Sequence, residues 1–129
     1  MFTIEQIKAA HGKVKSGADF PAYIQAIKAL GVTHYETYVV DGHIDYHGAP
    51  RHSVKVPAKY PSLTIAERPH TEAFKAALTA HQRGQTDFLT FIKGCADFGI
   101  AKWEISMEKM TCTYFDAANV EVLTEHIPQ

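Results

Sequence analysis

The chain has 129 residues, which predicts one domain over residues 1–129 that buries roughly two thirds of its unfolded surface and needs neither a metal nor a disulfide to fold. Its 13 basic and 14 acidic side chains give a net charge of -1, which is not the basic balance typical of nucleic-acid-binding proteins, so no nucleic-acid partner is expected. The two cysteines lack Cys-x-x-Cys spacing, and neither a signal peptide nor an apolar run of membrane-spanning length is present, so a cytoplasmic protein without membrane contact is expected.

Two helices are predicted at the start of the chain. Thr3 and Gln6 have the spacing of a capping box, and the apolar stripe that follows indicates a helix that ends at Gly17. A second helix is expected to begin near Asp19, to bury one apolar face and to end at Gly31.

Strands are predicted next. Residues 32–40 are rich in β-branched and aromatic side chains, and Asp41-Gly42 is a strong signal for a two-residue hairpin loop. A return strand to about His47 and a short third strand around 53–56 follow. Three prolines then mark residues 57–70 as a connecting segment.

The second part of the chain predicts the same order of elements. Helices are expected near residues 71–83 and 87–98, and strands near 102–107, 111–115 and 120–126. Helices followed by hairpin-connected strands favour an α+β fold, in which the helices cover one face of an antiparallel sheet.

The similarity of the two parts extends to individual residues. Shifting residues 19–49 by 68 positions aligns them without a gap on residues 87–117, where several residues coincide and the hydrophobic pattern repeats. We therefore expect a duplication, with halves 1–56 and 71–127 joined by the connecting segment. A repeat of this length is too long for a solenoid unit and predicts two ααβββ halves about a pseudo-twofold axis.

One face of the predicted sheet is polar. With Asp41-Gly42 as the hairpin loop, Glu36 is expected to face His47 and Tyr38 to face Asp45. The candidate ligand-binding residues share this face, and they are His34, Glu36, Tyr38, Asp45, His47 and Glu104. The opposite face is apolar and is expected to lie against the helices, with Cys112 as a buried side chain.

Three interpretations of the polar face remain open. It is a solvated or partner-binding surface, a small-molecule site in which Glu36 and His47 act as a general acid/base pair, or a site for a divalent metal such as zinc. A metal held by His43 and His47 together is disfavoured, because four residues of strand separate them by roughly 13 Å. The remaining metal geometry is His47 with Glu36 opposite and His34 diagonal. The prediction assigns no metal and no cofactor.

Three stretches of the sequence carry a resemblance to a known family. "FTIEQIKAAHGKVKSGADFPAYI", "LGVTHYETYVVDGH" and "MTCTYFDAA" resemble the YdfO-like and YbcV-like family of small bacterial, often prophage-associated proteins. That family is a domain of unknown function, and some of its members are labelled phage envelope proteins. The resemblance implies a single α+β domain and a phage or prophage association, and it supplies no reaction.

The sequence therefore predicts a non-enzymatic binding or interaction module that holds an unknown protein partner or small ligand on its polar sheet face. A homodimer is one of the expected oligomeric states. The alternative is a small enzyme of hydrolase or isomerase type, with Glu36 and His47 as catalytic residues and with Tyr38 and Asp45 in support. A component of a phage particle is a third possibility, and it depends on the family label alone.

Overall fold

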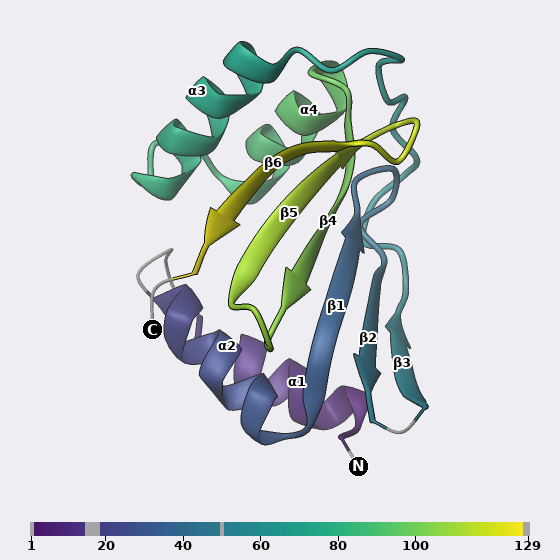
Figure 1. The fold of residues 1–129 in the computed structure, drawn as a ribbon, viewed down its shortest axis with the longest axis vertical. Coiled ribbons are helices and arrows are strands. Elements are labelled where there is room, and N and C mark those ends of the chain that lie inside the picture. The colour runs from purple at the N-terminus through teal and green to yellow at the C-terminus, as the bar shows by residue number, and fades with distance from the viewer. Residues whose placement is uncertain (1, 15–18, 50, 128–129) are drawn as a thin grey trace.

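The computed structural model describes residues 2–14, 19–49 and 51–127. These residues form four α-helices and a six-stranded antiparallel sheet, as the α+β prediction required (Figure 1). The helices are α1 (Ile4–His11), α2 (Phe20–Ala29), α3 (Thr71–Gln82) and α4 (Phe88–Asp97). The strands are β1 (Val32–Tyr38), β2 (Ile44–Gly48), β3 (His52–Val56), β4 (Ile100–Ser106), β5 (Thr111–Asp116) and β6 (Glu121–His126).

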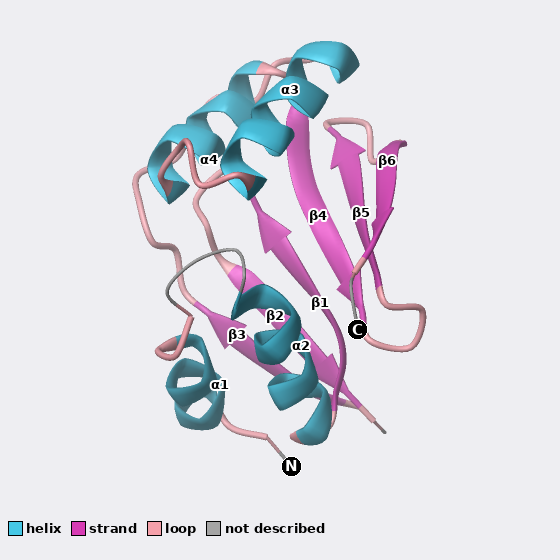
Figure 2. Ribbon diagram, turned by 90° about the vertical axis from the view of Figure 1, so that its left-hand side faces the viewer, coloured by secondary structure: helices cyan, strands magenta, loops and turns pink. Residues whose placement is uncertain are grey.

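The strands lie in the order β3-β2-β1-β4-β5-β6, so β1 and β4 form the centre of the sheet. The pair α1 and α2 packs at one end and the pair α3 and α4 at the other, on the same side of the sheet (Figure 2). Contacts between helices and strands identify the covered face. The Tyr23 hydroxyl of α2 lies 2.8 Å from the Tyr46 hydroxyl of β2, and Phe74 of α3 packs edge-on against Tyr114 of β5. The opposite face of the sheet is open.

The core lies between the helices and the covered face of the sheet. Buried residues alternate with partly buried ones along β2, β5 and the later part of β1, as expected for the two-residue period of a strand, and in β4 Ile100 and Ile105 are buried. Cys95 of α4 and Cys112 of β5 belong to this core, so the prediction that Cys112 is buried is confirmed. Burial raises the pKa of the Cys112 thiol to about 12, and it is therefore protonated at neutral pH.

The first helix ends earlier than predicted. The capping box of Thr3 and Gln6 is present, but α1 ends at His11 and not at Gly17, which lies outside the described residues. The amides of Lys13 and Val14 donate to carbonyls three residues back, so the helix tightens into a 3₁₀ turn after Gly12. Glycine has a high entropic cost within a helix, which favours an end at this position.

The register of the first hairpin differs from the prediction by two residues. Glu36 lies opposite Asp45 and not His47, and the Tyr38 amide donates to the carbonyl of His43, so Tyr38 does not face Asp45. The loop contains four residues because the amide of the fully buried Val39 donates to a carbonyl of β4 instead of continuing the ladder with β2. A shift of two residues keeps each side chain on its predicted face.

The two parts of the chain have matching elements at the predicted offset of 68 residues. The bounds of α2 and α4 correspond, as do those of β1 and β4, and both hairpins contain a bulge at the equivalent residues Thr33 and Ala101. Glu36 pairs with its equivalent Glu104 across β1 and β4. This register is the one that a twofold axis between these two residues would require. The superposition of the two parts of the chain stays a prediction.

Candidate functional site

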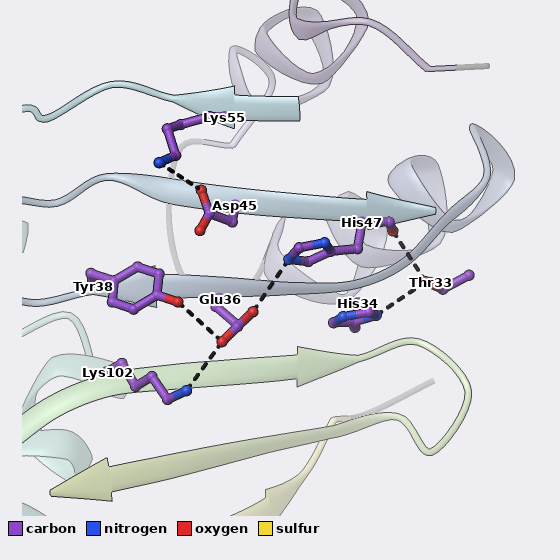
Figure 3. A network of polar contacts seen from close by, with 8 residues as sticks. All are labelled: Thr33, His34, Glu36, Tyr38, Asp45, His47, Lys55 and Lys102. Atoms are coloured by element: carbon purple, nitrogen blue, oxygen red, sulfur yellow. Dashed lines mark hydrogen bonds and ion pairs between the residues drawn. The ribbon is translucent and has the colours of Figure 1, made fainter. Parts of the chain in front are cut away.

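The open face of the sheet carries the polar residues singled out in the sequence (Figure 3). We call this surface the polar face and define it by the outward side chains of β1, β2, β4 and β5. Its members in the first hairpin are His34, Glu36, Tyr38, Asp45 and His47, and its members in the second hairpin include Lys102, Glu104, Ser106, Thr113 and Phe115. All of these side chains are partly buried, so neighbouring groups restrict their geometry without closing them off from water.

Glu36 is the centre of the contacts on this face (Figure 3). The Lys102 ammonium donates to Glu36 Oε2 at 3.1 Å, and the Tyr38 hydroxyl donates to the same oxygen at 3.2 Å. The other carboxylate oxygen, Oε1, lies 3.2 Å from His47 Nε2. Partial burial alone would raise the pKa of Glu36, but the hydrogen bond and charge of Lys102, with Tyr38 and His47, lower it below 4.5. Glu36 is therefore a carboxylate at neutral pH.

Tyr38 and Lys102 fix the orientation of the Glu36 carboxylate. Burial and the charge of Glu36 raise the pKa of Tyr38 to about 12, so its hydroxyl remains a donor at neutral pH. The Lys102 ammonium lies 5.0 Å from the ring centre of Phe115 and 5.9 Å from that of Tyr38. These aromatic rings hold the ammonium on the polar face in addition to its ion pair with Glu36.

His34 and His47 face each other across β1 and β2. Their rings are stacked, with centres 4.5 Å apart and planes 13° apart. The hydroxyl of Thr33 lies 3.1 Å from His34 Nδ1 and donates to the backbone carbonyl of His47 at 3.1 Å. His47 Nε2 is buried and makes no hydrogen bond among the described residues, although it is close to Glu36. The 3.2 Å contact is therefore an ion-pair distance without hydrogen-bond alignment.

The structure brings together the three residues that the sequence left as the remaining metal geometry. The possible ligand atoms of His34, Glu36 and His47 all lie within 4.8 Å of one another. The predicted arrangement was wrong in its pairing, because His34 lies opposite His47 and Glu36 is the diagonal residue. The other candidates lie elsewhere on the face. Asp45 is 4.0 Å from Lys55 of β3.

A groove runs along the polar face over the second hairpin and β6. It has a volume of about 570 Å³, and its walls include His34, Glu104, Ser106, Thr113, Phe115 and Thr124. Its charged side chains are three carboxylates, Glu104, Glu108 and Glu121, and one ammonium, Lys109. The local charge is therefore negative. Of the predicted site residues, His34 and Glu104 line this groove.

Sequence reasoning missed two residues of this site. Lys102 was not recognised as the partner of Glu36, because the pairing of β1 with β4 is not apparent from either hairpin alone. Thr33 was not singled out at all. Its contact with His34 depends on the bulge in β1, which breaks the regular alternation and brings these two consecutive side chains within hydrogen-bonding distance. The available signal was that the sequence has alanine, Ala101, at the position 68 residues after Thr33.

Comparison with known proteins identifies a family whose function is unknown. A family model described as a protein of unknown function (DUF1398) matches residues 8–126. No curated protein matches the chain. Within the described residues, no helix has the length and apolar character required to span a membrane.

Proposed function

We propose that this chain, which belongs to the DUF1398 family of proteins of unknown function, is a non-enzymatic binding module that takes a small polar ligand on its open sheet face. The observation that carries the proposal is the groove of about 570 Å³ over the second hairpin, beside the contacts of Glu36. Its size is within the range of small-molecule sites, roughly 300–1,000 Å³. We also propose two further points. The chain has the prophage association that the family resemblance implies, and its two parts are related by a twofold axis.

The walls of the groove define the class of ligand. The hydroxyls of Ser106, Thr113 and Thr124 both donate and accept hydrogen bonds, which suits a hydroxylated ligand. The three carboxylates against one ammonium favour an amine-bearing ligand over an anion. Phe115 adds an apolar surface on which a flat ligand group can lie. We therefore propose an uncharged or positively charged ligand that carries hydroxyl or amino groups.

An acid/base enzyme is the second candidate, and one observation favours it. His47 Nε2 lies 3.2 Å from Glu36 Oε1 and makes no hydrogen bond among the described residues, so the two side chains are placed as a candidate acid/base pair. Glu36 itself is a poor general acid, because its lowered pKa keeps it ionised at neutral pH. The groove is also open along its length, whereas most catalytic sites enclose the reacting atoms. These points favour binding over catalysis.

The binding proposal is tested by titrating isotopically labelled protein with three probes and recording backbone amide spectra. The probes are glucosamine, spermidine and, as an anionic comparison, acetate. We expect glucosamine or spermidine to shift amide signals of β4, β5 and β6, and acetate to leave them unchanged. Thr113→Val and Phe115→Ala are expected to weaken the response, while Lys55→Ala, on the same face but outside the groove, leaves it intact. Shifts scattered over the whole surface, or none with any probe, would contradict the proposal.

A further inference from the structure

We infer that His34, Glu36 and His47 form a binding site for a divalent transition-metal ion of the zinc class. Two imidazoles and one carboxylate are a donor set that zinc accepts, and the three possible ligand atoms already lie within 4.8 Å of one another. The inference goes beyond the binding proposal, because it requires no ligand in the groove and is tested with the metal alone.

Thr33 determines which nitrogen of His34 is available. The single hydroxyl proton of Thr33 is donated to the carbonyl of His47, so towards His34 its oxygen can only accept. Nδ1 of His34 must therefore carry the proton of the neutral imidazole. The lone pair is then on Nε2, the nitrogen that remains for a metal. This hydroxyl has the role of the outer-shell group that fixes the tautomer and orientation of a metal-binding histidine.

Glu36 and His47 provide the other two donors. Lys102 and Tyr38 both donate to Glu36 Oε2, which leaves Oε1 on the side of His47. Nε2 of His47 makes no hydrogen bond among the described residues. In the neutral tautomer with its proton on Nδ1, His47 has a lone pair on this buried nitrogen that has lost its hydration, and a metal ion at this position would compensate for that loss.

Metal binding requires one rearrangement of the site. The stacked rings of His34 and His47 point their lone pairs along nearly parallel planes, so both cannot meet at one ion as they stand. Thr33 holds the ring of His34, and His47 is therefore the ring expected to turn out of the stack. Zinc–nitrogen bonds of about 2.0–2.1 Å then bring the donors closer together than they are without the ion.

The second hairpin provides an internal contrast for this site. The residues equivalent to Thr33, His34 and His47 are Ala101, Lys102 and Phe115, so only the carboxylate is repeated, as Glu104. An ammonium and a phenyl ring cannot bind a cation as ligands. One metal ion per chain is therefore expected, in the first hairpin.

The test uses full-length protein purified without a histidine tag and freed of metal with a chelator. Zinc is titrated by calorimetry, and cobalt(II) is added separately as a probe whose visible absorption reports its ligands. We expect one equivalent of zinc to bind and to raise the melting temperature, because the ion binds only the folded chain. His34→Ala and His47→Ala are expected to lose at least about 100-fold in affinity and the cobalt absorption, while His43→Ala, on the same face but outside the three-residue group, retains both.

Thr33 separates a metal site from a chance cluster. Thr33→Val removes the hydroxyl with little change in shape and is expected to weaken zinc binding about 10- to 100-fold, whereas Thr33→Ser retains it. Melting curves without metal establish that each variant folds, and His47→Gln replaces any alanine variant that does not. The inference is overturned if wild-type protein binds no stoichiometric zinc, or if His34→Ala and His47→Ala bind it as tightly as wild type. Equal affinity of Thr33→Val and wild type would overturn the role given to the hydroxyl.

Discussion

The two hairpins of the sheet have the same strand pairing and differ in the side chains that point outward. The ladders β1–β2 and β4–β5 have the same register at an offset of 68 residues, and each contains a bulge at the same place. Their inward residues are alike, with Tyr35 and Tyr46 in one and Trp103 and Tyr114 in the other. Outward, His34 and His47 of the first hairpin correspond to Lys102 and Phe115 of the second.

This difference shows which constraint acts on each face. The inward residues must fill the space beneath a helix pair, and close packing leaves little freedom in their size and polarity. The outward residues meet water, so they can change without loss of the fold. The first hairpin carries a cluster of donors around Glu36, and a groove with hydroxyl and carboxylate walls lies over the second hairpin and β6. The proposed metal site therefore lies on the first hairpin, and the proposed groove lies over the second hairpin and β6 and reaches His34.

The largest expected effect tests the division between the two faces. Ile105 of β4 is 1% exposed, so Ile105→Ala should lower the free energy of unfolding by about 2–5 kcal/mol through lost burial and the cavity that remains. Thr124 of β6 is exposed on the opposite face, and Thr124→Ala should change it by about 0.5 kcal/mol or less. Urea unfolding of both variants measures the contrast. Similar losses in the two variants would mean that the faces have been assigned wrongly.

The elements and faces could be predicted from the sequence because they depend on local patterns. The period of the apolar residues indicates helix or strand, and alternation along a strand assigns each side chain to a face whatever the register. The register itself was predicted wrongly, since Asp41-Gly42 indicated a two-residue loop. The longer loop is held by the amide of Val39, which donates to a carbonyl of β4, and by Tyr60, whose hydroxyl donates to the carbonyl of Val39 and whose ring packs against Gly42.

Only part of the site could be predicted in the same way. The alternation placed His34, Glu36 and His47 on one face, and they do lie together. Identifying the partner of Glu36 required knowing that β1 lies beside β4, a long-range pairing that no short stretch of sequence indicates. The effect of Thr33 on His34 depends on the hydrogen bond that the Thr33 hydroxyl donates to the carbonyl of His47, and the sequence does not indicate this bond.

The second prediction compares Glu36 with its equivalent Glu104. Glu36 accepts from Lys102 and Tyr38, so Glu36→Gln should lower the free energy of unfolding by about 1–3 kcal/mol at neutral pH. The side chain of Glu104 makes no ion pair or hydrogen bond within the described part of the chain. Glu104→Gln should therefore change stability by about 0.5 kcal/mol or less. Chemical denaturation of the two variants, with the wild type as reference, measures both values.

The pH dependence of this difference gives a sharper test. The pKa of Glu36 in the folded protein is below its ordinary value of 4.5, so the folded state favours the ionised form. Its contribution is then complete above about pH 4.5 and is lost as the pH falls through the lowered value. The stability gap between wild type and Glu36→Gln should shrink in that window. Other carboxylates titrate in both proteins and cancel in the comparison, so a gap that stays constant down to the lowest pH would contradict the assigned ion pair.

The smallest expected effect concerns the outer edge of the first hairpin. Lys55 lies 4.0 Å from Asp45, and its side chain is 70% exposed, whereas Lys102 is 18% exposed and lies 3.1 Å from Glu36. Water and salt screen the first pair, and holding a long exposed side chain in place costs entropy. Lys55→Met should therefore change the free energy of unfolding by about 0.5 kcal/mol or less, at low and at high salt. Lys102→Met leaves a partly buried carboxylate without its cation and should cost more, with the larger loss at low salt. Equal effects of the two substitutions would show that burial does not distinguish these pairs. The contacts of Glu36 would then contribute no more to stability than an exposed ion pair does.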